Sequence, residues 1–288
     1  MLLHDPSLDE QTAPHCHLAI EFSDNTVTLS VLDLARRSFL AVALLQSNDP
    51  KGNPDDLKPS GLISGIPWLK FKFQSVSAAA VTNIFTLVPD AVFDAGHASG
   101  YLDYQFGNRN LSKVYWDRLR EAGLYVIYSI PDDLAGNLKS LFPGVKPVHH
   151  SSILLRSYNM HFSGKENPNV FLHFDDGYYS LTVLSGRSIL YFNTFPFETA
   201  EDAAYYTFFT LNQVKVNPSA SDFTLFGNID KNSPVFNLLR QYVKNLSFGH
   251  YNSFFTFSPY LSEISLHRFF RILNQYSALT HEDHNRKT

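Results

Sequence analysis

Residues 170–197, VFLHFDDGYYSLTVLSGRSILYFNTFPF, alternate apolar and polar side chains and are interrupted at Asp176-Gly177 and at Ser185-Gly186. A period of two, broken by turn residues at these intervals, predicts three antiparallel strands joined by tight turns. Residues 18–45, LAIEFSDNTVTLSVLDLARRSFLAVALL, repeat this pattern. We therefore expect two three-strand meanders in the chain.

The two stretches also match residue by residue. Aligned without a gap, they pair Phe22 with Phe174, and after a two-residue deletion in the second copy residues 37–40 fall on residues 187–190. Self-similarity of this kind indicates an internal duplication of one structural unit.

Helices and strands are expected to alternate after each meander. A helix that follows the second meander begins at Thr199, because Asp202 three residues later completes a capping-box pattern. Periodicity predicts further strands at residues 124–130 and 222–229, and further helices at residues 131–142, 151–160, 234–246 and 261–279.

The polar and turn-rich residues 163–168 separate the two halves of the chain. This break predicts a first lobe over residues 17–164, which includes an irregular insertion, and a second lobe over residues 165–280. Residues 1–16 and 281–288 are polar and aperiodic, so we expect disordered tails there.

Composition excludes several classes of protein. The 288 residues are 44% hydrophobic and 15% aromatic, which is enough material for packed domains. A net charge of −4, without a block of like charges, disfavours nucleic-acid binding. A single cysteine, Cys16, excludes a disulfide framework, and no apolar run approaches the roughly 20 residues of a membrane span. Without a signal-peptide pattern, we expect a bacterial protein of the cytoplasm.

Three antiparallel strands followed by alternating helices and strands, twice in one chain, resemble the actin, Hsp70 and sugar-kinase superfamily. The strands are similar to those of the actin-like proteins of pilus assembly and cell division. FTLVPD (85–90), YSIPDDL (128–134) and the second meander resemble an uncharacterised Bacteroidetes family with that fold. The resemblance implies an α/β, duplicated ribonuclease H-like (actin-like ATPase) fold of two lobes, each with a mixed sheet that starts in a three-strand antiparallel meander flanked by helices.

The resemblance also implies where a nucleotide would bind. In that superfamily the first turn of each meander contacts the phosphates, an Asp before the turn organises Mg²⁺, and a Gly lets the backbone amides approach. The implied positions of this cleft are Glu21, Ser23, Asp24, Thr28, His173, Asp175, Asp176, Gly177 and Gly227.

At these positions the phosphate-binding groups of the superfamily are missing. Glu21 and Ser23 replace the Asp and the Gly of the first turn, and Thr28 replaces a phosphate-directed Lys. His173 and Asp175 stand at the corresponding places in the second turn. A carboxylate within about 5 Å of a triphosphate disfavours binding by roughly a few kcal/mol unless a metal lies between them.

We therefore predict a non-catalytic, actin-like pseudo-ATPase without a cofactor, which serves as a scaffold or protein-interaction module for an unidentified protein partner. A competing hypothesis is an ATPase or phosphotransferase that binds ATP with Mg²⁺ through divergent loops and uses Asp24 or Asp176 as the metal-organising acid. A third possibility is a metal or small anion bound by His173, with Glu21 and Asp175 as further metal ligands. Hydrolase, Rossmann and P-loop motifs are absent from the sequence.

Overall fold

The structure, a computed structural model, describes residues 1–46, 61, 63, 65–107, 111, 113–164, 167–250 and 254–284. Three β-sheets are formed within these residues. The chain divides into two compact units. Unit 1 comprises Met1–Leu154, Ser253–Ile264 and Arg271–Thr288, and unit 2 comprises Leu155–Asn252 and Ser265–Phe270.

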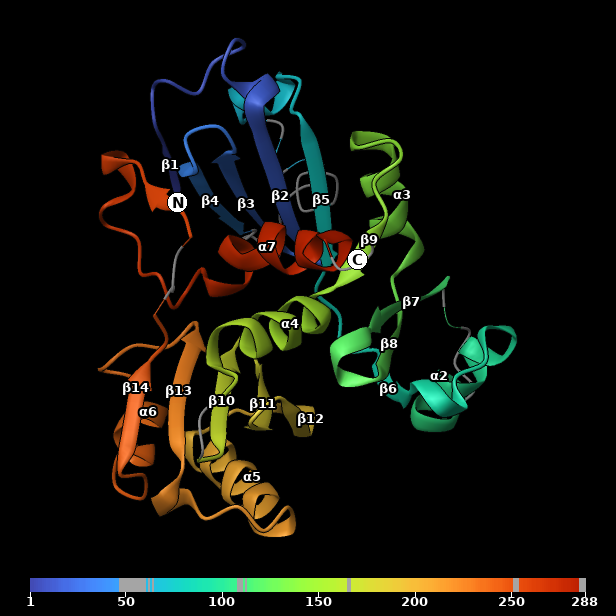
Figure 1. The fold of residues 1–288 in the computed structure, drawn as a ribbon, viewed down its shortest axis with the longest axis vertical. Helices are drawn as coiled ribbons and strands as arrows, with labels where there is room; N and C mark the ends of the chain where they lie inside the picture. Colours follow the sequence, from blue (N-terminus) through green and yellow to red (C-terminus); the bar gives the residue numbers. More distant parts are fainter. Residues whose placement is uncertain are drawn as a thin grey trace. The chain divides into compact units, whose positions relative to one another are not determined.

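The larger sheet of unit 1 contains the first predicted meander (Figure 1). Its strand order is β1-β4-β3-β2-β5-β9, and β15 also pairs with β4. The meander strands pair antiparallel, whereas β5 and β9 continue the sheet in parallel. The strands are β1 (Leu2–His4), β2 (Cys16–Phe22), β3 (Thr26–Asp33), β4 (Ser38–Gln46), β5 (Ser75–Ala80), β9 (Pro147–His149) and β15 (Thr256–Phe257).

A smaller antiparallel sheet in unit 1 has the order β6-β8-β7. It consists of β6 (Phe85–Pro89), β7 (Val114–Leu119) and β8 (Leu124–Ser129). Helix α2 (Ala98–Phe106) packs on it, with Leu102 in one apolar cluster with Val88 and Ile127.

Unit 2 is built on a five-stranded sheet of order β12-β11-β10-β13-β14. Its strands are β10 (Asn169–Phe174), β11 (Tyr178–Ser185), β12 (Ser188–Pro196), β13 (Asp222–Gly227) and β14 (Asn245–Phe248). Side chains such as Leu172 and Leu181 form a core with α5 (Ala200–Gln213) and α6 (Pro234–Leu239). Thr199 and Asp202 form the predicted capping box at the start of α5.

The sheets of the two units have the same topology. The order β4-β3-β2-β5-β9 in unit 1 corresponds to β12-β11-β10-β13-β14 in unit 2. The strand register shifts between Val31 and Leu32 in one meander and between Val183 and Leu184, the aligned residues, in the other. A bulge at the same place in both meanders extends the sequence match to a detail of the backbone.

Three further helices complete the described fold: α3 (Asp132–Leu141), α4 (His150–Phe162) and α7 (Phe270–His284). The boundary between the units falls within α4 and at the start of α7. Short 3-10 helices lie at Ala13–His15, Pro67–Lys70, Asp90–Val92, Ala95–His97, Arg120–Ala122, Pro218–Ala220 and Pro259–Leu261. None of the helices in the described ranges has both the length and the apolar character needed to cross a bilayer.

The chain termini differ from the sequence prediction. Residues 1–16 do not form the predicted disordered tail, because Leu2–His4 form β1 and pair with Ala41–Ala43 of β4. A three-residue strand gives no periodic signal, so the sequence pattern could not reveal it. Residues 281–284 extend α7, and residues 285–288 of the predicted tail lie outside the described residues.

The predicted lobe boundaries also differ from the observed units. The lobes were expected at residues 17–164 and 165–280, but residues 253–264 and 271–288 belong to unit 1. These C-terminal segments return to the first sheet, where β15 pairs with β4 and α7 packs on β2 and β5. Such long-range contacts leave no mark in local sequence patterns.

Candidate functional site

The first candidate turn, between β2 and β3, is closed by its own side chains. The Ser23 amide donates to the Thr26 carbonyl at 2.9 Å, and the Thr26 amide donates to Ser23 Oγ at 3.2 Å. Asn25 Oδ1 accepts from the hydroxyls of Ser23 and Thr26 at 3.4 and 3.2 Å. Glu21 lies next to this turn and pairs across the sheet with Thr28. The Thr26 amide, which a phosphate loop would direct at an anion, is occupied within the turn.

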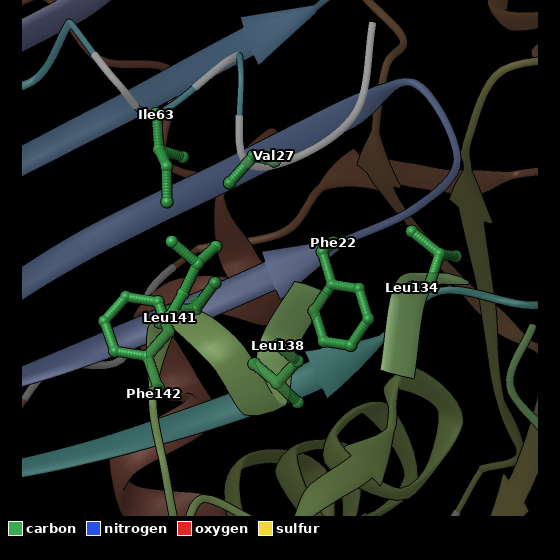
Figure 2. A pocket seen from close by; sticks show the side chains of 8 residues that line it. Phe22, Val27, Ile63, Leu134, Leu138, Leu141 and Phe142 are labelled. Atoms are coloured by element: carbon green, nitrogen blue, oxygen red, sulfur yellow. The ribbon is translucent and has the colours of Figure 1, made fainter. Parts of the chain in front are cut away.

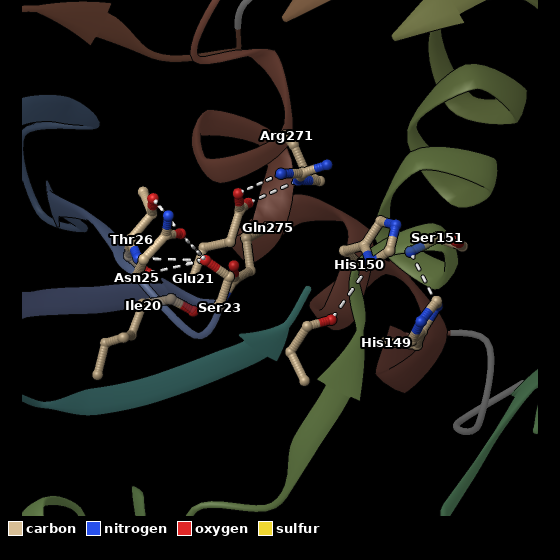
Figure 3. A network of polar contacts seen from close by, with 11 residues as sticks. Ile20, Glu21, Ser23, Asn25, Thr26, His149, His150, Ser151, Arg271 and Gln275 are labelled. Atoms are coloured by element: carbon tan, nitrogen blue, oxygen red, sulfur yellow. Dashed lines mark hydrogen bonds and ion pairs between the residues drawn. The ribbon is translucent and has the colours of Figure 1, made fainter. Parts of the chain in front are cut away.

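Glu21, which the sequence resemblance predicts at the position of the superfamily's metal-organising acid, forms a buried ion pair (Figure 3). Arg271 of α7 donates through Nε to Oε2 at 2.7 Å and through Nη2 to Oε1 at 2.5 Å. Glu21 is 7% exposed and Arg271 is 5% exposed. A two-point arginine contact of this kind takes up both carboxylate oxygens and neutralises their charge.

Helix α7 is fixed to the strand by a second polar side chain. One turn after Arg271, Gln275 Nε2 donates to the Ile20 carbonyl at 3.2 Å and to Ser77 Oγ of β5 at 2.8 Å. Ser77 Oγ also lies 2.8 Å from Nε2 of the buried His17, whose Nδ1 is 2.8 Å from Ser75 Oγ. Burial lowers the pKa of His17 to about 4, so the ring is neutral at pH 7.

Additional negative charge lies beside the first turn. Desolvation, together with the neighbouring Asp133 carboxylate at the start of α3, raises the pKa of Asp24 above its ordinary value. An anion placed here would meet like charge. In unit 1 the structure therefore brings together Glu21, Ser23, Asp24 and Thr28, without a described lysine or glycine in the turn.

The second candidate turn, between β10 and β11, has a different set of contacts. The Asp175 amide donates to the Tyr178 carbonyl at 2.9 Å, as the Ser23 amide does in the first turn. Asp176 Oδ1 accepts from Asn228 Nδ2 at 3.2 Å, and Asn228 Oδ1 accepts from the Arg268 guanidinium at 2.7 Å. An exposed arginine is thus linked through Asn228 to this acidic turn.

Two glycines shape the second site in different ways. Gly177 has φ of +77° with open space around it, so its role is that of a hairpin glycine. Gly227 has φ of +81°, and a Cβ there would lie 2.1 Å from the Phe174 carbonyl oxygen. That carbonyl accepts the Asn228 amide at 2.8 Å. Gly227 is therefore required for the close approach of β13 to β10.

His173, the counterpart of Glu21 in unit 2, is a buried side chain of β10. It is 2% exposed, and its ring stacks on Phe226 with centroids 6.3 Å apart. Among the residues that the structure describes, no group of three or more His, Cys, Asp and Glu side chains could hold a metal ion. The third possibility, a metal held by His173, Glu21 and Asp175, thus finds no ligand cluster in the described chain.

An apolar pocket in unit 1 was not expected from the sequence (Figure 2). It is a partly open hollow of about 20 Å³ between the tip of the meander, Ile63 and α3. Its lining is Ile20, Phe22, Val27, Ile63, Leu134, Leu138, Leu141 and Phe142. Because neighbouring strand residues point to opposite faces, Ile20 and Phe22 lie on the face away from Glu21. The pocket offers no polar group to a nucleotide.

Sequence patterns alone do not reveal the basic partners of the two sites. Arg271 lies 250 positions from Glu21, and Arg268 lies 40 positions from Asn228. The only available signal was the amphipathic pattern of residues 261–279, which predicts a helix but not its packing partner.

Comparison with known proteins places the chain in a family. A family model described as protein of unknown function (DUF3822) matches residues 5–246. The chain belongs to the DUF3822 family. A search among curated proteins finds no match.

Solved structures establish the fold of this DUF3822 protein. A Bacteroides thetaiotaomicron protein with an actin-like ATPase fold and unknown function aligns at a TM-score of 0.75, with 14% identity, over 84% of this chain and 93% of that one. A chain of the PilM–PilN type IV pilus biogenesis complex aligns at a TM-score of 0.57, with 14% identity, over 91% of this chain and 97% of that one. The DUF3822 chain thus has an actin-like ATPase fold, as the sequence resemblance predicted.

Proposed function

We propose that this DUF3822 protein is a non-catalytic member of the actin-like ATPase fold, a scaffold or protein-interaction module that does not bind nucleotide. The observation that carries the proposal is the buried ion pair between Glu21 and Arg271. A Mg²⁺-nucleotide in the first turn would need the Glu21 carboxylate, but both oxygens of that carboxylate already accept hydrogen bonds from Arg271. Breaking such a pair costs about 3–5 kcal/mol.

The groups around the ion pair support the same reading. The Thr26 amide is occupied by Ser23 Oγ, and the carboxylates of Asp24 and Asp133 lie near each other. A phosphate group would therefore meet few free donors and additional negative charge. The first turn is better suited to holding unit 1 together than to binding an anion.

A protein partner is supported by one of the structural neighbours. The similar chain of the PilM–PilN structure forms part of a two-protein complex. We extend this mode of action to the DUF3822 protein, because its first turn, as far as the structure describes it, offers a phosphate neither lysine nor glycine, while the surface of the folded chain remains available for protein recognition.

Calorimetric titration of the full chain with ATP and Mg²⁺ tests the proposal. We expect no binding tighter than about 100 μM, which corresponds to roughly −5.5 kcal/mol. The matched control is an Arg271→Lys variant. It retains a cation beside Glu21, so we expect it to bind ATP no better than the unaltered chain does. Saturable binding of ATP below about 100 μM by the unaltered chain would refute the proposal.

A second candidate function has one observation in its favour. Arg268 is linked through Asn228 to the second turn, where Gly227 brings the backbone of β13 close to β10. An arginine and a glycine beside a turn are groups that phosphate sites use. The alternative is an ATPase or phosphotransferase in which Asp176 organises Mg²⁺.

Phosphate release from a panel of nucleotides and sugar phosphates separates the two candidates. The enzyme hypothesis requires turnover that Asp176→Ala abolishes, while Asp230→Ala, a change at another acid of unit 2, leaves it intact. The scaffold proposal expects no turnover from the unaltered chain.

We further infer that the two units arose by duplication of one ancestral segment. The shared strand order and the bulges at aligned positions support this origin. The turns have since diverged, one toward the Glu21–Arg271 pair and the other toward the buried His173.

A further inference from the structure

The outer edge of the first meander is paired with other strands of unit 1. β1 runs antiparallel along residues 41–43 of β4, and β15 pairs with residues 38–39 of the same strand. The contact with β1 continues to the Leu44 amide, which donates to the Met1 carbonyl at 2.9 Å. Unit 1 therefore shows how the edge of this repeated meander is covered: an antiparallel strand is added to it.

Strand β12 occupies the same place in the second meander. Ala41 pairs with Val31, and Tyr191 pairs with Val183, the residue that aligns with Val31. Residues 41–43 of β4 thus correspond to residues 191–193 of β12. In the part of the chain that the structure describes, β12 ends its sheet and no strand pairs with its outer side (Figure 1).

The sequence of β12 lacks the usual features of a protected edge. Natural edge strands are kept from pairing with other chains by charges, prolines or short length. β12 is nine residues long, and no charged residue lies between Arg187 and Glu198. Its proline, Pro196, is its last residue, and Leu190 is 46% exposed. Such an edge is a template for pairing with another strand.

The bulge in β12 is compatible with an added strand. Leu190 is the extra residue of this bulge, because Ile189 and Tyr191 pair with consecutive residues of β11. Its counterpart in β4 is Leu40, the extra residue of the first bulge. The Leu40 carbonyl nevertheless accepts the Asp5 amide, which follows β1, at 2.7 Å. A strand added to β12 can therefore pass a bulge at this position.

We propose that β12 is a homodimer interface, on which β12 of a second copy of this chain pairs antiparallel about a two-fold axis. The position of the axis follows from unit 1, where Leu3 of β1 lies opposite Val42, the counterpart of Phe192. With the axis at Phe192, Leu190 of one copy lies opposite Thr194 of the other. The sheets of the two copies then continue into one another.

Symmetry and charge favour a second copy as the added strand. A two-fold axis makes two copies of one strand antiparallel, which is the direction in which β1 covers β4. The exposed Arg187 then lies opposite Phe197 of the second copy, next to the exposed Glu198. Opposite charges thus meet at both ends of two uncharged strands. The inference does not depend on nucleotide binding, so it stands or falls separately from the proposed function.

Sedimentation velocity of the full chain over a concentration series tests the proposal. We expect a monomer–dimer equilibrium. Leu190→Lys combined with Thr194→Lys should raise the dimer dissociation constant by about 10-fold or more at low salt, because each lysine lies opposite a lysine of the second copy. The matched control is Ser247→Lys, which adds a lysine at an exposed position of β14, at the other end of the same sheet, and should leave the constant unchanged.

A change in the sign of one charge tests the register. In Leu190→Lys combined with Thr194→Glu, each lysine lies opposite a glutamate of the second copy, so this variant should dimerise about 10-fold more tightly than the double-lysine variant at low salt. Far-ultraviolet circular dichroism of every variant confirms that it is folded. Hydrogen exchange needs no variant: in the unaltered chain, exchange of the backbone amides in residues 188–196 should slow as the dimer forms.

Four results would each overturn the proposal. One is a monomer up to about 100 μM, which would leave the edge of β12 to an extended segment of another protein. The others are a dimer that the double-lysine variant leaves intact, equal dissociation constants for the lysine–lysine and lysine–glutamate variants, and a dimer in which hydrogen exchange at residues 188–196 is unchanged.

Discussion

Replacement of Arg271 by Met should destabilise unit 1 strongly, because it leaves the Glu21 carboxylate buried without its counter-ion. Glu21 is 7% exposed and Arg271 is 5% exposed, and two hydrogen bonds of 2.7 and 2.5 Å join them. Removal of one partner from such a pair costs about 3–5 kcal/mol of the free energy of unfolding. With a urea dependence of about 3 kcal/mol per molar, the unfolding midpoint should fall by roughly 1 M or more.

A double-mutant cycle isolates the ion pair from other effects of the arginine. Glu21→Gln combined with Arg271→Met removes both charges, so the double variant should be about 2–3 kcal/mol more stable than the sum of the two single losses predicts. Arg268→Met is the matched control, because Arg268 is exposed and should cost less than about 1 kcal/mol. Single variants that each cost under about 1 kcal/mol and add independently would show that the pair does not hold Glu21.

Three further changes test other parts of the structure. Burial lowers the pKa of His17 below its unfolded value of 6.5, so the unfolded chain binds the proton first and stability falls as the pH drops from about 6.5 towards 4. Between pH 7.5 and pH 5, the free energy of unfolding measured in urea should therefore fall by about 2 kcal/mol less in His17→Gln than in the unaltered chain. An equal fall in the two proteins would contradict a neutral, buried His17 ring. Gly227→Ala should lower the free energy of unfolding of unit 2 by about 3 kcal/mol or more, because the new Cβ would clash with the Phe174 carbonyl. Gly177→Ala is the control: its φ is similar but the space around it is open, so it should cost about 1 kcal/mol. Equal costs for the two variants would contradict the tight approach of Gly227 to Phe174. Thr199→Ala removes the helix cap of α5 and should cost about 1 kcal/mol by thermal unfolding, with Thr199→Ser near neutral; an alanine variant as stable as the serine one would count against the cap.

The regular parts of the fold follow from short-range patterns. The alternation in residues 18–45 and 170–197 predicts the meanders, and the strand pairings confirm both of them. The Thr199 capping box was readable because its two partners are three residues apart. Features that depend on neighbours within about one helical turn or one hairpin are visible in a single sequence.

Features that depend on distant parts of the chain could not be predicted. β1 is three residues long and becomes a strand only because β4 offers it an edge. The sequence shows a glutamate, Glu21, where the resemblance predicts the superfamily's aspartate. It does not show that Glu21 binds an arginine, because Arg271 lies 250 positions away. Helical periodicity places Arg271 on a helix without indicating which strand that helix covers.

The second candidate site shows the same limit. The sequence placed Asp175, Asp176 and Gly177 in one turn, and the structure agrees. It could not indicate that Gly227 packs on the Phe174 carbonyl, because the contact arises from the parallel pairing of β10 and β13. A glycine at a strand end has many uses, and only the paired strand decides among them.

A crystal structure of the full chain grown with millimolar ATP and Mg²⁺ would show whether the first turn binds a nucleotide. We expect Arg271 to donate to both carboxylate oxygens of Glu21 and no nucleotide density to lie beside residues 23–26. Phosphates bound at that turn, with Glu21 released from Arg271 and directed towards Mg²⁺, would contradict this expectation.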